Sequence, residues 1–296
     1  MLPAAARATR PRLRIPVFLR AAVLGSLATL GAAMPAAADA GTAAPATDAV
    51  LQQAAPLAAL EPGAVLRLAD GTALRLAFLR LPDVMTDLPA AGDGAAIEVA
   101  AWRERSEAAL RDMLGGAPVR FRALAAAPDR YGALPALVTA ADGSPLQEGL
   151  LSRGLARLDL AGLGAPEAEA LRAAEAQARM RHLGLWNATP YRVRALAELW
   201  DWVGTYQVAV GRVHSAARVG DKFFVNFGPE YDSDVTVLFK GPVARRFRDE
   251  VAAGRRLEGC PVLVRGWIEF WNGPLVAAST PAQVEPLESC EGEAER

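Results

Sequence analysis

The sequence has little histidine and little cysteine, and beyond its first forty residues it has no long apolar run. Its 296 residues include two histidines and two cysteines. His182 and His214 stand in different segments without neighbours at metal-ligand spacing, so we expect solvated or packed imidazoles there. No stretch after residue 40 is long and apolar enough to predict a membrane helix. Basic residues are not in excess either, with 32 Lys and Arg against 33 Asp and Glu. This balance argues against nucleic-acid binding by a generally basic surface.

The first forty residues have the layout of a secretory signal peptide. Five arginines precede an apolar run over 21–34, and small residues lead to Ala38-Asp39-Ala40, which fits an A-x-A cleavage pattern. The apolar run is short for a bilayer span, and an uncleaved anchor is the alternative interpretation. We therefore expect a periplasmic or secreted protein. Without residues 1–40 the chain has 27 basic and 32 acidic side chains and a net charge of −5, so only a local basic patch could bind nucleic acid.

The remaining chain divides by composition and periodicity into two predicted domains. The predicted segments are a flexible lead-in over 41–59, a first domain over 60–187, a helical linker over 188–203, an OB-like domain over 204–285 and an acidic tail over 286–296. Strands and helices are mixed along the first domain, whereas the second is mostly β. The fold class is therefore α+β, dominated by small β-barrels.

The first domain is organised around the stretch Leu66–Asp83. Two alternating apolar runs meet at Asp70-Gly71, which predicts a β-hairpin. Pro82 ends the second run, so Asp83 should lie in a loop at a strand end, where its carboxylate can face a ligand. Arg75 belongs to the same run and is expected to emerge from the barrel wall. The elements predicted after this hairpin are a loop over 86–94, a helix over 98–114, strands over 118–124 and 134–140, a short helix over 145–153 and a long helix over 166–182.

Four pieces of this domain, taken together, resemble the staphylococcal nuclease (thermonuclease) family over about residues 60–186. They are Leu74–Asp83, Asp129-Arg130-Tyr131-Gly132, Leu146–Ala156, and Glu175–Arg179 leading to Gly184-Leu185-Trp186. The resemblance implies a five-stranded OB-type barrel with packed helices. In active members of the family, it also implies two aspartates that hold Ca²⁺, a glutamate that positions water and two arginines that clamp the phosphodiester.

Most positions of that implied site have changed in this chain. Arg75 retains the first arginine, and Asp83 replaces the glutamate with one methylene less reach. Arg80 stands where the family places its second metal-binding aspartate, while Ala64 and Ala133 stand at the first aspartate and the second arginine. The Ca²⁺ ligands are not retained, and an arginine repels the cation it would have to help bind. We therefore expect no metal and no other cofactor.

The residual site leaves several functions open. Arg75 and Asp83 are the remaining catalytic candidates, and Arg80, Arg130 and Tyr131 are candidates for binding. Arg80 and Asp83 could pair to form a metal-free anion pocket, or Arg75 and Asp83 could form a plain structural ion pair. We predict a degenerate nuclease that binds nucleic acid or another anion, or acts as a scaffold for an envelope protein. The alternative is an active phosphodiesterase that uses Arg75 and Asp83.

The second domain is predicted to be an OB-like barrel. Its expected elements are strands over 205–213, 222–227, 235–239, 261–270 and 275–278, with a helix over 242–253. The aromatic residues that could stack on a ligand are Phe224, Phe227, Trp267, Phe270 and Trp271. Core filling is expected for most of them. Trp271 is the binding candidate because it precedes the turn Asn272-Gly273, and the basic run over 245–248 is read as a solvated helix face.

The two cysteines, Cys260 and Cys290, both lie near the C-terminus. In an oxidising compartment a disulfide between them would close a loop of about thirty residues and add about 3–4 kcal/mol. The alternative is a buried strand cysteine and an exposed tail cysteine that never meet.

Overall fold

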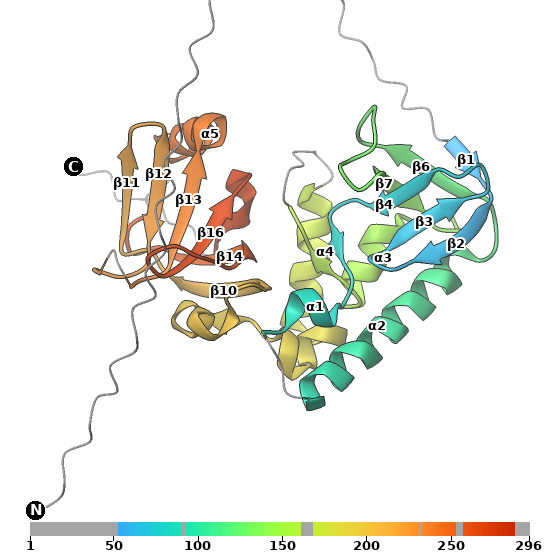
Figure 1. Cartoon of the computed structure of the whole chain (residues 1–296), viewed down its shortest axis with the longest axis horizontal. Coiled ribbons are helices and arrows are strands. Elements are labelled where there is room, and N and C mark those ends of the chain that lie inside the picture. Colours follow the sequence, from blue (N-terminus) through green and yellow to red (C-terminus); the bar gives the residue numbers. More distant parts are fainter. Residues whose placement is uncertain (1–52, 90–92, 161–167, 231–232, 253–256, 288–296) are drawn as a thin grey trace, which may run out of the picture. The chain divides into compact units, whose positions relative to one another are not determined.

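The computed structural model describes residues 53–89, 93–160, 168–230, 233–252 and 257–287 (Figure 1). The predicted leader, most of the lead-in and the tail from residue 288 lie outside these ranges. Among the described helices, none is long and apolar enough to cross a membrane.

The N-terminal half is built on a six-stranded sheet of order β1-β6-β7-β4-β3-β2 (Figure 1). Its strands are β1 Gln53–Ala55, β2 Leu57–Glu61, β3 Val65–Leu68, β4 Ala73–Leu76, β6 Val119–Ala123 and β7 Leu134–Thr139. β3 and β4 pair antiparallel with Arg67 opposite Ala73, which confirms the hairpin at Asp70-Gly71. The α+β class is confirmed as well. Within the described strands the two edges β1 and β2 do not pair with each other, so the sheet is open rather than a closed barrel.

Three helices pack on this sheet and complete its core. They are α2 Asp93–Leu114, α3 Leu146–Ser152 and α4 Ala168–Met180, which match the predicted helices with shifted ends. Leu110 of α2, Leu150 of α3 and Leu171 of α4 are buried in one cluster with Leu66 and Leu74 of the sheet. Leucines at helical spacing meet alternating apolar residues of the strands, as an amphipathic helix on a half-buried sheet requires.

The run after Arg75 differs from the prediction of one strand ending at Pro82. β4 ends at Leu76, and Phe78 has a φ of 63°, a left-handed conformation that few non-glycine residues adopt. The chain therefore changes direction, and β5 Leu79–Arg80 pairs with β8 Arg157–Leu158 in a separate two-stranded sheet. The loop predicted over 86–94 is also wrong in part, because a short helix, α1 Val84–Asp87, begins directly after Asp83.

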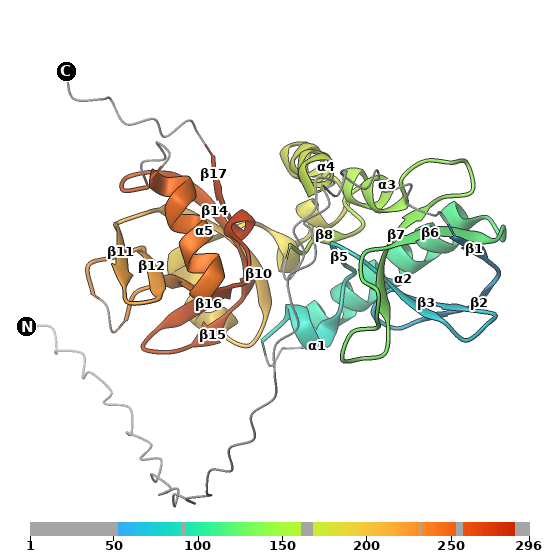
Figure 2. The same ribbon diagram turned by 90° about the horizontal axis from the view of Figure 1, so that it is seen from above.

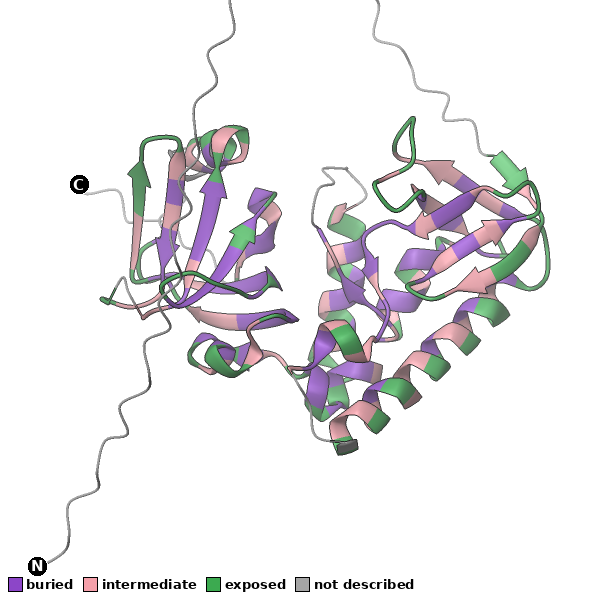
Figure 3. Cartoon of the chain, in the orientation of Figure 1, coloured by how far each residue is buried: buried purple, intermediate pink, exposed green. Residues whose placement is uncertain are grey.

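The C-terminal half consists of two sheets, of order β17-β14-β10-β9 and β11-β12-β13-β16-β15. Their strands are β9 Arg194–Ala195, β10 Tyr206–Arg212, β11 Ser215–Val219, β12 Lys222–Asn226, β13 Thr236–Lys240, β14 Pro261–Trp267, β15 Glu269–Phe270, β16 Pro274–Ala278 and β17 Val284–Pro286. The helix α5 Gly241–Ala252 packs against β12 and β13 (Figure 2). Figure 3 shows buried residues along β13 and largely exposed ones along the edge strand β11. The sequence did not predict β9, β11 or β17.

Short 3₁₀ helices connect the larger elements. They are η1 Gly184–Asn187, η2 Thr189–Tyr191, η3 Leu196–Trp202 and η4 Pro281–Gln283. The predicted helical linker over 188–203 thus corresponds to η2, β9 and η3. All described residues belong to one compact unit that begins at Ala49.

Candidate functional site

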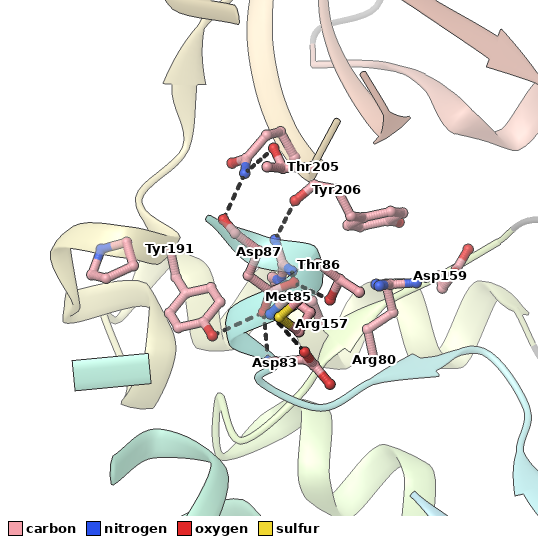
Figure 4. A network of polar contacts seen from close by, with 12 residues as sticks. Arg80, Asp83, Met85, Thr86, Asp87, Arg157, Asp159, Tyr191, Thr205 and Tyr206 are labelled. Carbon is pink, nitrogen blue, oxygen red and sulfur yellow. Dashed lines mark hydrogen bonds and ion pairs between the residues drawn. The ribbon is translucent and has the colours of Figure 1, made fainter. Parts of the chain in front are cut away.

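The short helix α1 places Asp87 in a fully buried ion pair with Arg157 of β8. Asp87 Oδ1 accepts a hydrogen bond of 2.6 Å from Arg157 Nη2, and the two side chains are 0% and 2% exposed. Asp87 Oδ2 accepts from the Tyr191 hydroxyl at 2.9 Å and from the Asp83 backbone N–H at 3.0 Å (Figure 4). Arg157 Nη1 donates to the backbone carbonyl of Tyr206 at 2.9 Å. Both charges therefore have several partners, which a buried ion pair requires.

Tyr191 is fixed as a hydrogen-bond donor by this environment. Burial, followed by the neighbouring Asp87 carboxylate, raises the pKa of Tyr191 above its ordinary range. The phenol therefore stays protonated and keeps donating to Asp87 throughout the pH range in which proteins are usually folded.

A second buried ion pair joins α4 to β14. Glu175 Oε2 accepts from Arg265 Nη1 at 2.6 Å, and both side chains are fully buried. Glu175 Oε1 accepts from the Leu158 backbone N–H at 2.7 Å. Burial lowers the pKa of Arg265, but the Glu175 carboxylate outweighs it and the net shift is upward. Because Tyr206 and Arg265 come from the C-terminal half, both buried pairs connect the two halves of the described chain.

Arg80 of β5 is held by aromatic rings of the C-terminal half. Its guanidinium carbon lies 4.7 Å from the ring centroid of Tyr206 and 4.7 Å from that of Trp267. Arg80 Nη1 also lies 3.5 Å from Asp159 Oδ2, and the Arg80 side chain is only 17% exposed. Two cation–π contacts and one ion pair fix the guanidinium in place. The alternative in which Arg80 pairs with Asp83 is therefore wrong, since Arg80 pairs with Asp159.

Asp83 serves α1 instead. Its Oδ1 accepts from the Met85 backbone N–H at 2.8 Å, so the carboxylate caps the first turn of the helix. Its Oδ2 lies 3.5 Å from Arg103 Nη1 of α2. The prediction that Asp83 follows the end of a strand is correct. However, a helix begins directly after it, and its carboxylate accepts a hydrogen bond from a backbone N–H of that helix.

Arg75 of β4 is paired with Asp129 rather than with Asp83. Arg75 Nε lies 3.0 Å from Asp129 Oδ2, and Asp129 Oδ1 accepts from the backbone N–H groups of Tyr131 and Ala133. Burial alone would raise the pKa of Asp129, but these N–H groups and Arg75 outweigh it and lower the pKa. Asp129 therefore stays ionised and forms the ion pair with Arg75. The suggested ion pair between Arg75 and Asp83 is wrong.

The remaining binding candidates are exposed. The guanidinium of Arg130 lies 4.8 Å from the Tyr131 ring centroid, and Tyr131 is 76% exposed. Trp271 is 52% exposed, as expected from its turn. Trp267 and Phe270 are also exposed, and Phe224 and Phe227 are only partly buried, so the expectation that most of the five aromatic residues fill the core is wrong.

A family comparison places these residues in context. Residues 75–188 match the family model described as staphylococcal nuclease homologue. This segment is a staphylococcal nuclease-like domain. A search of curated proteins finds no match to the chain. The matched segment begins at Arg75 and ends before β10, so Tyr206 and Trp267, which hold Arg80, lie outside the nuclease-like domain.

Three positions of the site that the resemblance implies are occupied by Ala64, Ala133 and Arg80, none of which carries an oxygen ligand of the kind that Ca²⁺ takes. Ala64 and Ala133, at two positions of the implied site, are buried methyl groups at 3% and 4% exposure. Arg80, at the third, brings a positive charge. Among the residues that the structure describes, no three His, Cys, Asp or Glu side chains are grouped as metal ligands.

The sequence did not single out the two buried ion pairs. The available signal was a lone charged residue inside an apolar strand pattern, such as Arg157 before Leu158 and Arg265 after Val264. Cys260 is buried and carries no free thiol, whereas Cys290 lies outside the described residues, so their disulfide stays a prediction.

Proposed function

We propose that the nuclease-like domain binds nucleic acid or another anionic ligand without hydrolysing it. The observation that carries the proposal is the position of Arg80, whose cation is fixed between two rings and a carboxylate where the family holds its metal. A divalent cation approaching this place meets a like charge that has little freedom to move away. The second arginine is replaced by Ala133, and the loss of one such donor costs about 2.7–4 kcal/mol of transition-state stabilisation.

Binding is supported by the turn that carries Arg130 and Tyr131. Asp129 ties this turn to Arg75, and beyond it an exposed ring and an exposed guanidinium face solvent together. A ring that can stack on a base beside a cation that can meet a phosphate suits a single-stranded nucleic acid. The leader composition supports export to the periplasm or the medium.

The proposal is tested by adding Ca²⁺ and a labelled single-stranded DNA to the full chain and measuring binding and cleavage together. We expect binding without cleavage, and we expect Tyr131→Ala to weaken binding by about fivefold to a hundredfold through a lost stacking contact. Met85→Ala is the matched control, because Met85 is at least as exposed as Tyr131 but lies on α1. Ca²⁺-dependent cleavage that disappears in Arg75→Ala would overturn the proposal.

A further inference from the structure

The outer face of the sheet β11-β12-β13-β16 carries a pocket of about 370 Å³. In β12, Phe223 and Val225 point into the core, so Phe224 and Asn226 point outward. Phe224 pairs with Ala217 of β11, and Asn226 pairs with Thr236 of β13, which puts these side chains on one face. An aromatic ring and small or polar neighbours therefore form the floor of the pocket, and Trp271 forms one wall.

The Trp271 wall is held in place by its turn. The Trp271 backbone N–H donates to the Gly273 carbonyl at 2.9 Å, and Asn272 and Gly273 have φ of 53° and 125°. A Cβ on Gly273 would lie only 2.9 Å from the Asp234 carbonyl oxygen, so the turn packs tightly on the segment before β13. The half-exposed indole therefore stands on a backbone that is fixed in place, which lowers the entropy lost when a ring stacks on it.

Positive charge lies beside this aromatic pocket. Lys222 Nζ is 5.9 Å from the Trp271 ring centroid and has no carboxylate partner among the described residues. A second cavity, of about 220 Å³, also includes Lys222 and is lined by Arg218, Arg245 and Arg248 together with Asp221. Arg248 is paired with Asp249, whereas Arg218 and Arg245 form no ion pair within the described residues. Among the described residues that line the aromatic pocket, none is acidic.

We propose that this face of the C-terminal half is a separate site for single-stranded nucleic acid. One base stacks on Trp271 above the floor formed by Phe224, and an adjoining phosphate meets Lys222. Arg218 pairs with the core-facing Phe223 and so lies on the other face of the sheet. A neutral sugar would use the ring but not the ammonium group of Lys222, so the charge beside the pocket favours a ligand with alternating rings and phosphates. The inference rests on the proposed function for its ligand class, but it uses residues outside the nuclease-like domain.

The experiment measures fluorescence anisotropy of a labelled oligothymidylate of about ten nucleotides titrated with the full chain. Trp271→Ala should raise the Kd at least fivefold. Lys222→Ala should raise the Kd and reduce the slope of log K against log salt by about 1. Trp200→Ala is the control and should leave the Kd unchanged, because Trp200 is exposed in the same half and packs on Phe270 but does not line the pocket.

The outcomes separate this inference from the proposed function. A wild-type Kd retained in Trp271→Ala but lost in Tyr131→Ala would overturn the inference and leave the proposed function standing. Ca²⁺-dependent cleavage together with a Kd that depends on Trp271 would overturn the proposed function and support the inference. No binding of the oligonucleotide by the wild type, or binding of a neutral oligosaccharide in its place, would overturn the inference and would restrict the proposed function to an anionic ligand other than single-stranded DNA.

Discussion

At the scale of single residues, the chemistry of the site depends on what each charge is paired with. Arg75, Arg80 and Asp83 could be located from the sequence because they stand in one short motif around Pro82. Their partners could not, because Asp129 and Asp159 are 54 and 79 residues away from the arginines they meet. Alternation along a strand shows which face a side chain takes, but not which distant loop lies there.

The Asp87–Arg157 pair provides a direct test at this scale. Asp87→Asn keeps the shape of the side chain but leaves Arg157 as an uncompensated buried cation, so the free energy of unfolding should fall by about 3–5 kcal/mol. Urea denaturation followed by circular dichroism measures this loss. Asp249→Asn is the control, because it breaks an exposed ion pair with Arg248 and should cost less than about 1 kcal/mol. Equal losses in the two variants would contradict this account.

At the scale of elements, patterns of buried apolar residues were sufficient for the long helices and the central strands. α3, β6 and β7 were predicted close to their observed ends, because each carries a clear apolar periodicity. α2 was predicted to its observed C-terminal end, but it begins at Asp93, before the predicted start at residue 98. β11 was missed because its residues are exposed or half-buried and show no alternation. The break at Phe78 was missed because nothing in a local pattern predicts a left-handed phenylalanine.

The contact between α3 and η1 gives a prediction at this scale. Gly154 has a φ of 65°, and a Cβ there would overlap the backbone carbonyl of Leu183. Gly71 has a φ of 87° but open space around it. Both substitutions by alanine incur the left-handed cost of about 1–2 kcal/mol. Gly154→Ala should lose about 1–3 kcal/mol more than Gly71→Ala through steric overlap. Urea titrations of the two variants measure this difference. Similar losses in the free energy of unfolding would show that the segments of Gly154 and Leu183 move apart at little cost.

At the scale of the whole molecule, the two halves share buried charges instead of a flexible boundary. Arg157 binds the backbone of Tyr206, the Tyr206 hydroxyl donates to Leu158 at 2.8 Å, and Arg265 pairs with Glu175. Removing either half would leave ionised groups of the other half without partners. From the sequence we predicted two barrels joined by a linker. The contacts between the halves were missed because buried polar contacts between distant segments leave no periodic signal.

Substitution of Arg265 tests this coupling. Arg265→Met leaves the buried Glu175 carboxylate without its main partner, so the free energy of unfolding should fall by about 3–5 kcal/mol. Amide hydrogen exchange should then accelerate in β7 and α4 as well as in β10 and β14, since the halves unfold together. Arg212→Met, on an exposed side chain of β10 that donates to the Gly259 carbonyl and pairs with no carboxylate of the described residues, should change neither. Faster exchange confined to the C-terminal strands would contradict the coupling.

The position of Arg80 also determines what a substitution there would change. An Arg80→Asp change would set a new carboxylate near Asp159 and remove the cation that Tyr206 and Trp267 enclose. The fold should lose stability, because two cation–π contacts and one ion pair are lost together. Under the proposed function, regaining metal-dependent hydrolysis would therefore begin with a step that costs stability. The arginine and the two rings thus tie the chemistry of this position to the stability of the fold.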